Sequence, residues 1–145
     1  MKCYADTSFL VSLYSSDANS ARADLWRQAN PDPLPFTPLH ALEVRSALWQ
    51  TAFKKTRMPN EILVILREIE LDIAAGILFK PPGDFDDIWN LACSFADVHT
   101  MVVGARSLDI LHVAAAHWLQ AQELVTFDHR QSALTARIGL KIAAV

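Results

Sequence analysis

No apolar run in the sequence is long enough to cross a bilayer. A membrane-spanning helix needs about 18 or more consecutive apolar residues, whereas the run at 62–66 is followed at once by Arg67, Glu68 and Glu70. We therefore expect a protein that does not span a membrane. The N-terminus carries one basic residue, Lys2, and then an acidic residue where a signal peptide would have its apolar stretch. A cytoplasmic location is the resulting expectation.

Cysteine and basic charge are also scarce. The two cysteines, Cys3 and Cys93, each lie in an apolar segment, and two are too few for a disulfide framework. Buried free thiols are expected. The 13 Lys and Arg residues are outnumbered by 16 Asp and Glu, for a formal net charge of -3. Nucleic-acid-binding proteins usually carry a basic surplus, so charge alone argues mildly against that class.

The spacing typical of a zinc site is missing as well. The five histidines form no His-Glu-x-x-His pattern, and the cysteines are not paired at short spacing. We therefore expect structural roles for the histidines. His112 lies one helical turn after Asp109, and a hydrogen-bonded core or interface position is expected for it.

The chain does have enough apolar material for one hydrophobic core. It is 145 residues long, with 52% apolar residues, and it contains no repeat, low-complexity segment or dividing linker. These features predict a single domain over residues 1–145.

Short apolar runs alternate with helical patterns along the chain. The runs predict strands at 2–5, 34–37, 77–80, 124–127 and 141–145. The patterns between them predict N-caps at Asp17, Asp84 and Ser107 and helices at 7–13, 17–29, 38–55, 59–75, 84–95 or beyond, 108–120 and 129–137. This alternation predicts an α/β fold with a central, largely parallel β-sheet flanked by helices.

Acidic residues follow two of the predicted strands. Asp6 comes directly after the first strand, Asp128 comes after the fourth, and Asp109 lies in the first turn of a helix. Reactive groups gather at the carboxyl ends of parallel strands, because the following loops and helix N-termini converge there. Glu43 lies inside a predicted helix, on a face with the small residue Ser46, and it could equally point to solvent.

A cluster of carboxylates favours one kind of chemistry. Hard oxygen ligands suit Mg²⁺ or Mn²⁺, and such a site hydrolyses phosphodiesters by activating a water and neutralising charge on the phosphoryl group. Each acid also has an ordinary structural interpretation. Asp6 and Asp109 fit helix caps, and Asp128 fits the start of a turn. Placement alone leaves the two interpretations about equally supported.

Four motifs give the chain a resemblance to a known family. They are Tyr-Ala-Asp-Thr-Ser at 4–8, Glu-Val-Arg-Ser-Ala-Leu at 43–48, Arg-Ser-Leu-Asp-Ile-Leu-His-Val-Ala-Ala-Ala at 106–116 and Thr-Phe-Asp at 126–128. The chain resembles the PIN-domain nucleases, and among them the VapC-type toxins of type II toxin–antitoxin pairs. The likeness runs from end to end, and the motif at 106–116 is the most specific.

The resemblance implies roles for eight residues. By motif, the catalytic and metal-binding acids are Asp6, Glu43, Asp109 and Asp128, of which the last is the most variable in the family. The supporting polar positions are Thr7, Ser8, Ser46 and Thr126. Ser46 stands where many relatives have Asn, and its hydroxyl can still donate one hydrogen bond.

The resemblance also implies an activity and its partners. It implies a Mg²⁺- or Mn²⁺-dependent endoribonuclease that cuts structured RNA such as transfer or ribosomal RNA. It further implies a homodimer that is inhibited by a cognate antitoxin protein.

Other functions compete with the nuclease. One is a catalytically silent binding module that keeps the fold and engages a protein partner. Another is a phosphatase or phosphoryl-transfer domain with Asp6 as nucleophile, although a haloacid-dehalogenase-type site needs a second acid where this chain has Ser8. A receiver-like phospho-acceptor lacks the paired acids expected at the first strand.

Three arginines and the four tryptophans also stand out in the sequence. Arg45, Arg106 and Arg130 lie near predicted acids in sequence, and phosphate binding and surface ion pairing are equally open for them. All four tryptophans fall on predicted helices, which favours core or dimer packing. One of them, Trp49, recurs on a helix face with the apolar residues Leu42 and Phe53.

Overall fold

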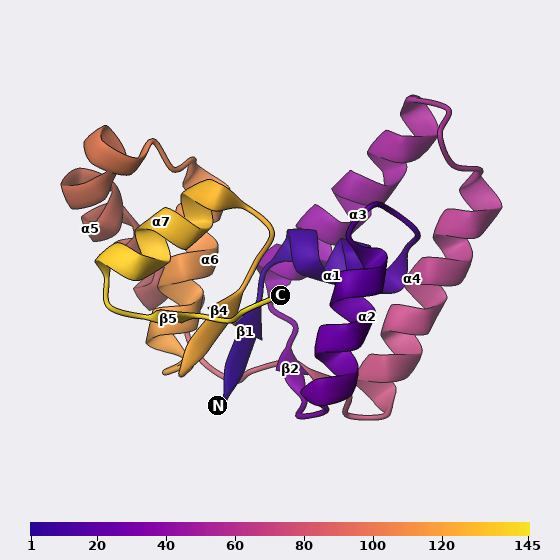
Figure 1. The fold of residues 1–145 in the computed structure, drawn as a ribbon, viewed down its shortest axis with the longest axis horizontal. Coiled ribbons are helices and arrows are strands. Elements are labelled where there is room, and N and C mark those ends of the chain that lie inside the picture. The colour runs from indigo at the N-terminus through magenta and orange to yellow at the C-terminus, as the bar shows by residue number, and fades with distance from the viewer. The chain divides into compact units, whose positions relative to one another are not determined.

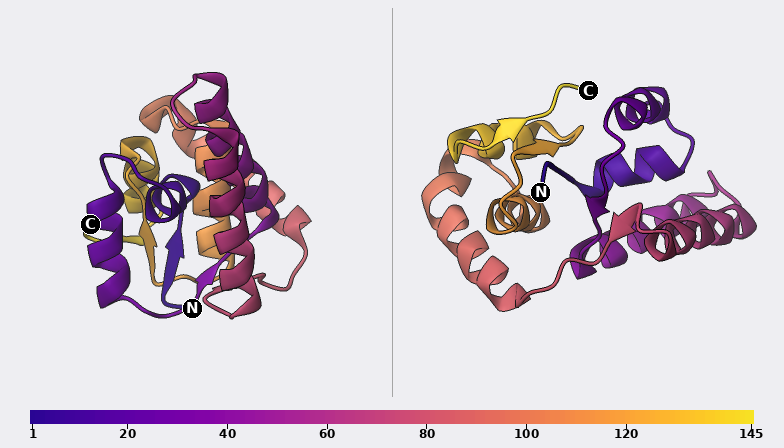
Figure 2. Two further views of the ribbon diagram at one scale, coloured as in Figure 1. Left: turned by 90° about the vertical axis from the view of Figure 1, so that its right-hand side faces the viewer. Right: turned by 90° about the horizontal axis from the view of Figure 1, so that it is seen from below.

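The computed structural model describes residues 1–145, in which consecutive strands are separated by one or two helices (Figures 1 and 2). The chain divides into two compact units. Unit 1 comprises residues 1–6 and 82–145, and unit 2 comprises residues 7–81. Each unit has its own helices and its own parallel sheet.

Unit 1 contains a three-stranded parallel sheet. Its strand order is β1 (Cys3–Ala5), β4 (Glu123–Val125) and β5 (Lys141–Ile142). Its helices are α5 (Phe85–Val103), α6 (Ser107–Trp118) and α7 (His129–Arg137), and α6 packs against both of the others. The carboxyl ends of β1 and β4 therefore lie side by side, since Ala5 pairs with Val125.

Helix α6 forms the centre of unit 1. Every residue from Asp109 to Ala116 is buried, so the helix has no solvent-facing stripe over this span. A helix that is apolar around its circumference is expected to be enclosed by other elements. The three consecutive alanines Ala114, Ala115 and Ala116 allow the neighbouring elements to approach closely.

Unit 2 is mainly helical. It comprises α1 (Thr7–Tyr14), α2 (Ser20–Ala29), α3 (Pro38–Phe53) and α4 (Pro59–Ala74), with a parallel pair formed by β2 (Leu34–Pro35) and β3 (Leu78–Phe79). Helix α1 packs against α2, α3 and α4. The buried rings of Phe9 and Trp26 meet edge to face, with centroids 5.0 Å apart.

The predicted fold class is confirmed. Each predicted strand and helix is present, and every strand pairing is parallel. The strands form two sheets, whereas a single central sheet was predicted. No helix is both long and apolar enough to span a membrane.

Two of the three predicted N-caps are wrong. Asp84 caps α5 by accepting a hydrogen bond from Asp86 N, as predicted. Helix α2 begins only at Ser20, because Asp17 uses its carboxylate in the preceding turn, where it accepts from Asn19 N at 2.8 Å. Ser107 is the first residue of α6, and the N-cap position belongs to the residue before it.

The burial prediction for one cysteine is wrong, and several apolar side chains on helices are exposed. Cys3 and Cys93 are both free thiols, but only Cys3 is buried. Leu42, Trp49 and Phe53 are 67%, 40% and 84% exposed, because α3 buries a different stripe that includes Val44 and Leu48. Of the tryptophans, Trp26 is buried, whereas Trp89 is 57% exposed.

Candidate active site

Asp6 lies at the carboxyl end of β1, where the sheet holds it against β4. Its backbone N–H donates to Val125 O at 3.1 Å, which extends the strand pairing by one residue. Its side chain is buried, and Thr126 Oγ1 donates to Asp6 Oδ2 at 2.8 Å. A buried carboxylate needs such donors, because removing it from water is otherwise costly. Thr126 therefore holds one carboxylate oxygen of Asp6 within unit 1.

Asp128 caps helix α7. Its Oδ1 accepts from the backbone N–H groups of Arg130 and Gln131, at 2.8 and 2.9 Å. Its own N–H donates to Thr126 Oγ1 at 2.9 Å. An N-cap of this kind stabilises a helix by about 1 kcal/mol. The structural role that the sequence allowed for Asp128 is thus present, and it uses only one of the two carboxylate oxygens.

Asp109 is buried in the first turn of α6 and is held at both oxygens. Its Oδ2 accepts from the backbone N–H of Arg106 at 3.1 Å and lies 3.6 Å from Arg106 Nε. Its Oδ1 accepts from Gln131 Nε2 at 3.3 Å. The Arg106 side chain itself is 72% exposed.

These contacts form one continuous series of hydrogen bonds in unit 1. The series runs from Asp6 through Thr126 to Asp128, then through Gln131 to Asp109. Three of the four predicted acids are therefore connected by two polar residues. No role was predicted for Gln131 from the sequence. The available signal was its place three residues after an N-cap, where Gln often completes a capping box.

Glu43, the fourth predicted acid, lies in unit 2. Its Oε2 accepts a hydrogen bond of 2.9 Å from Oγ1 of Thr7, the residue that follows Asp6 in the chain. The Glu43 side chain is half-buried, so it does not simply point to solvent. The predicted supporting residues Ser8 and Ser46 are exposed, whereas Thr7 is buried.

The oxygen donors present fit a hydrated hard cation. No group of three or more His, Cys, Asp or Glu side chains in the structure could hold a metal ion. Mg²⁺, however, usually keeps several waters and is bound through one or two carboxylates. A carboxylate has about four lone-pair sites, and the hydrogen bonds of Asp128 use only Oδ1. The donor set therefore fits Mg²⁺ or Mn²⁺ with water completing the coordination.

Other polar groups near the motifs have structural partners. His112 Nδ1 and Tyr4 Oη lie 2.9 Å apart in the core of unit 1, which confirms the expected core role of this histidine. Arg45 forms an ion pair with Glu70 at 3.2 Å, which agrees with surface ion pairing, one of the two roles left open for it.

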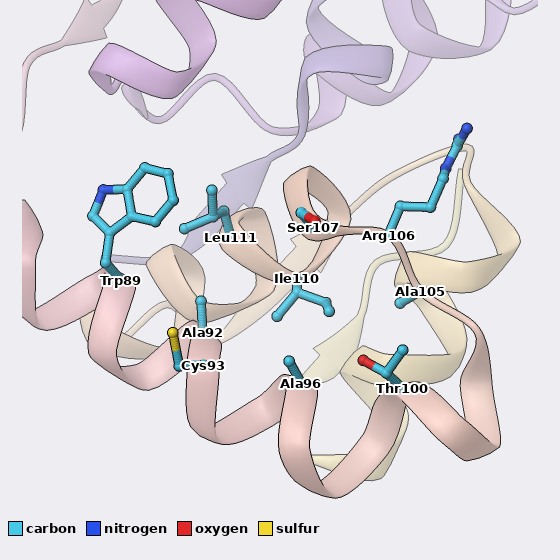
Figure 3. Close-up of a pocket in the computed structure, with 10 residues that line it drawn as sticks. All are labelled: Trp89, Ala92, Cys93, Ala96, Thr100, Ala105, Arg106, Ser107, Ile110 and Leu111. Carbon is cyan, nitrogen blue, oxygen red and sulfur yellow. The ribbon is translucent and has the colours of Figure 1, made fainter.

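Figure 3 shows a pocket of about 490 Å³ that differs chemically from the part of unit 1 that holds these carboxylates. It lies between α5 and α6, and its lining is mostly apolar, with Trp89, Ala96, Ile110 and Leu111 around it. None of the four predicted acids lines it. The side chain of Arg106, at one end, extends away from Ile110 (Figure 3).

Comparison with known proteins identifies the fold. No protein-family model matches the sequence, and no curated protein sequence matches it significantly. Among solved structures, the chain resembles VapC20 of Mycobacterium tuberculosis, described as a toxin that cleaves the sarcin–ricin loop. The TM-score is 0.69 at 16% identity, over 91% of this chain and 94% of that one.

Two further structures show the same likeness. FitAcB from Neisseria gonorrhoeae matches with a TM-score of 0.63 at 15% identity, over 98% of this chain and 96% of that one. The protein PAE2754 from Pyrobaculum aerophilum matches with a TM-score of 0.58 at 19% identity, over 92% and 84%. At these identities the likeness concerns the fold, and the chain has the PIN-domain fold that the resemblance of its motifs implied.

Proposed function

We propose that this protein is a divalent-metal-dependent endoribonuclease and the toxin of a toxin–antitoxin pair. The observation that carries the proposal is the hydrogen-bonded series that connects Asp6, Asp128 and Asp109 at the end of the unit 1 sheet. The likeness of the fold to that of VapC20, a sarcin–ricin loop cleaving toxin, supports RNA as the substrate. Ribosomal or transfer RNA is the proposed substrate class.

The acids proposed for the Mg²⁺ or Mn²⁺ site are Asp6, Asp109, Asp128 and Glu43, of which one or two would bind the ion directly and the others through its waters. The first three are supported by their shared hydrogen bonds, and Glu43 by its motif and its contact with Thr7. When bound, the metal supplies an activated water and neutralises charge that develops on the phosphoryl oxygens.

The protein's own contribution is to hold these carboxylates in place before RNA arrives. Thr126 fixes one oxygen of Asp6, and the backbone N–H of Arg106 fixes one oxygen of Asp109. Groups that are already oriented need no reorganisation during the reaction, which lowers the barrier. The exposed guanidinium of Arg106, beside Asp109, is suited to contact an RNA phosphate.

The deciding experiment is incubation of the purified, antitoxin-free chain with total RNA in Mg²⁺ or Mn²⁺, and in EDTA. We expect discrete cleavage that EDTA abolishes and that Asp6→Asn and Asp109→Asn each reduce by at least about 100-fold, by loss of transition-state charge stabilisation. Asp97→Asn, at an exposed acid of α5, is the matched control and should keep full activity. Full cleavage by both site variants would refute the proposed mechanism.

A catalytically silent binding module is the second candidate. Its support is that Asp109 and Asp128 already serve as capping residues, so both have structural reasons to be present. Calorimetry with Mn²⁺ separates the two candidates, because a folded chain that binds no metal and cuts no RNA would favour the binding module. The hypothesis of a phosphoryl-transfer domain with Asp6 as nucleophile predicts a phosphorylated enzyme, which mass spectrometry would detect.

A protein partner belongs to the proposal as well. Large apolar side chains are exposed on α3 and α5, among them Phe53 at 84% and Met101 at 96%. Such surface is typical of association sites when it is contiguous. We propose that a cognate antitoxin and a second copy of this chain are the partners.

A further inference from the structure

Gln131 is a buried residue whose side-chain amide is only partly paired. It is 4% exposed and lies in the first turn of α7. Its Nε2 donates to Asp109 Oδ1 at 3.3 Å, but its amide oxygen, Oε1, is buried without any hydrogen-bond partner. An unpaired buried acceptor costs free energy, so another interaction must keep the amide in this orientation.

The charge of Asp109 explains the orientation of the amide. If the Gln131 amide were flipped, Oε1 would face Oδ1 of Asp109, and two acceptors would repel each other. The N–H groups would then also turn away from the carboxylate. Because hydrogen bonds to an ionised carboxylate are stronger than those between neutral groups, donation to Asp109 outweighs the unpaired oxygen.

The position of Gln131 makes this contact unusual. A Gln three residues after an N-cap ordinarily reaches back to the backbone N–H of that cap. Here the N–H of the cap, Asp128, already donates to Thr126 Oγ1 at 2.9 Å. The side chain of Gln131 is turned to Asp109, on another helix of unit 1.

We propose that Gln131 is a positioning residue that orients the Asp109 carboxylate for metal binding. The inference rests on the proposed function. With Gln131 in place, Asp109 is held at Oδ1 by the amide and at Oδ2 by the backbone N–H of Arg106. Without the amide, only the contacts at Oδ2 remain and the carboxylate gains rotational freedom. Loss of a residue that orients a metal ligand typically costs 10- to 100-fold in metal affinity.

The test compares Mn²⁺ affinity, measured by calorimetry on the full chain, with thermal unfolding of the metal-free protein. Gln131→Met keeps the bulk of the side chain but removes the donor and the unpaired oxygen. Gln131→Asn keeps the amide but shortens its reach, and it serves if the first variant folds poorly. Thr135→Val is the control, because Thr135 is buried one turn further along α7 and donates only to the backbone of Gln131.

We expect both Gln131 variants to raise the dissociation constant for Mn²⁺ by about 10-fold or more. The melting temperature of metal-free Gln131→Met should fall only slightly, because removal of the unpaired oxygen offsets part of the lost hydrogen bond to Asp109. Thr135→Val should lower the melting temperature and leave Mn²⁺ affinity unchanged.

Three results would overturn the inference, and they are distinguishable. Wild-type affinity in both Gln131 variants would reject the positioning role alone and leave the nuclease proposal intact. An equal loss of affinity in Thr135→Val would show that α7 packing is responsible, which also rejects the role. A folded wild type that binds no Mn²⁺ would reject both proposals.

Discussion

A single residue in the candidate site can combine an observed structural role with a proposed chemical one. Asp128 is the clearest case, because its Oδ1 caps α7 while its hydrogen bonds leave Oδ2 unused. A carboxylate can do both, since it offers about four acceptor sites. The structural and catalytic interpretations of such an acid are therefore compatible, and they can be separated by substitution.

Two substitutions at Asp128 separate the cap from the charge. Asp128→Asn keeps an oxygen that accepts from the N–H groups of Arg130 and Gln131, so the free energy of unfolding should change by less than about 0.5 kcal/mol. Asp128→Ala removes the cap and should cost about 1 kcal/mol. Both should weaken Mn²⁺ binding if the carboxylate is a ligand. Urea unfolding and calorimetry measure the two effects, and a stable Asp128→Asn variant with unchanged affinity would limit this residue to capping.

Two of the predicted supporting residues, Thr126 and Thr7, donate hydrogen bonds to predicted acids, whereas Gln131 was not predicted. Asp6 and Asp128 could be located because strand ends and turns leave local patterns in the sequence. The contacts of Gln131 could not be predicted. Its ordinary partner would be the backbone N–H of Asp128, but that group donates to Thr126, which is known only from the fold. The side-chain partner of Glu43 likewise depends on how α1 and α3 pack.

At the scale of elements, one hydrogen bond fastens helix α1 to helix α4. Tyr14, the last residue of α1, donates its hydroxyl to Asp72 Oδ2 at 2.5 Å. Burial of the ring, followed by the hydrogen bond to Asp72, raises the pKa of Tyr14 above its ordinary value of 10.0. The tyrosine therefore stays protonated in the folded chain at pH values where it ionises in the unfolded chain.

This raised pKa predicts how the stability of unit 2 depends on pH. The contribution of Tyr14 is fully present below pH 10, the ordinary pKa of tyrosine, and is lost as the pH rises above it, because the unfolded state then releases a proton that the folded state keeps. Tyr14→Phe should cost about 1 kcal/mol at pH 7, through the lost hydrogen bond to a part-buried carboxylate. Urea unfolding from pH 7 to pH 11 should show this difference shrinking above pH 10. A difference that is constant with pH would contradict the prediction.

The order of elements was predictable because local patterns determine it. Helix caps were less predictable than the order of elements. Asp17 and Ser107 are chemically suitable as N-caps, but neither occupies the N-cap position of its helix. The buried face of α3 could not be identified from the sequence either. That helix has apolar residues on two faces, and only the tertiary structure selects Val44 and Leu48 over Leu42 and Phe53.

At the scale of the whole molecule, the likeness to the solved structures extends over 91% to 98% of the chain. Both compact units are therefore part of the shared fold. The division into two compact units does not decide whether the chain is one domain, so a single domain over 1–145 stays a prediction. The number of units could not be read from the sequence, because unit 1 combines the first six residues with the last part of the chain.

The proposed homodimer is a prediction at this scale. Light scattering at micromolar concentration should give twice the chain mass of 16.1 kDa. The physical reason is the exposed apolar side chains of α3 and α5, which a second copy would remove from water. A mass equal to one chain would contradict the dimer without affecting the proposed RNA cleavage.

The split composition of unit 1 has a consequence for synthesis on the ribosome. Strand β1 emerges first, yet it pairs with β4, and Asp6 gains its contact with Thr126 only across 120 positions of sequence. Unit 2, at 7–81, is continuous and can fold earlier, because domains form as their residues emerge. The carboxylates of unit 1 are therefore joined only when translation nears its end. A product interrupted before residue 109 would carry Asp6 without Asp109 or Asp128, and it would lack the hydrogen-bonded series that connects them.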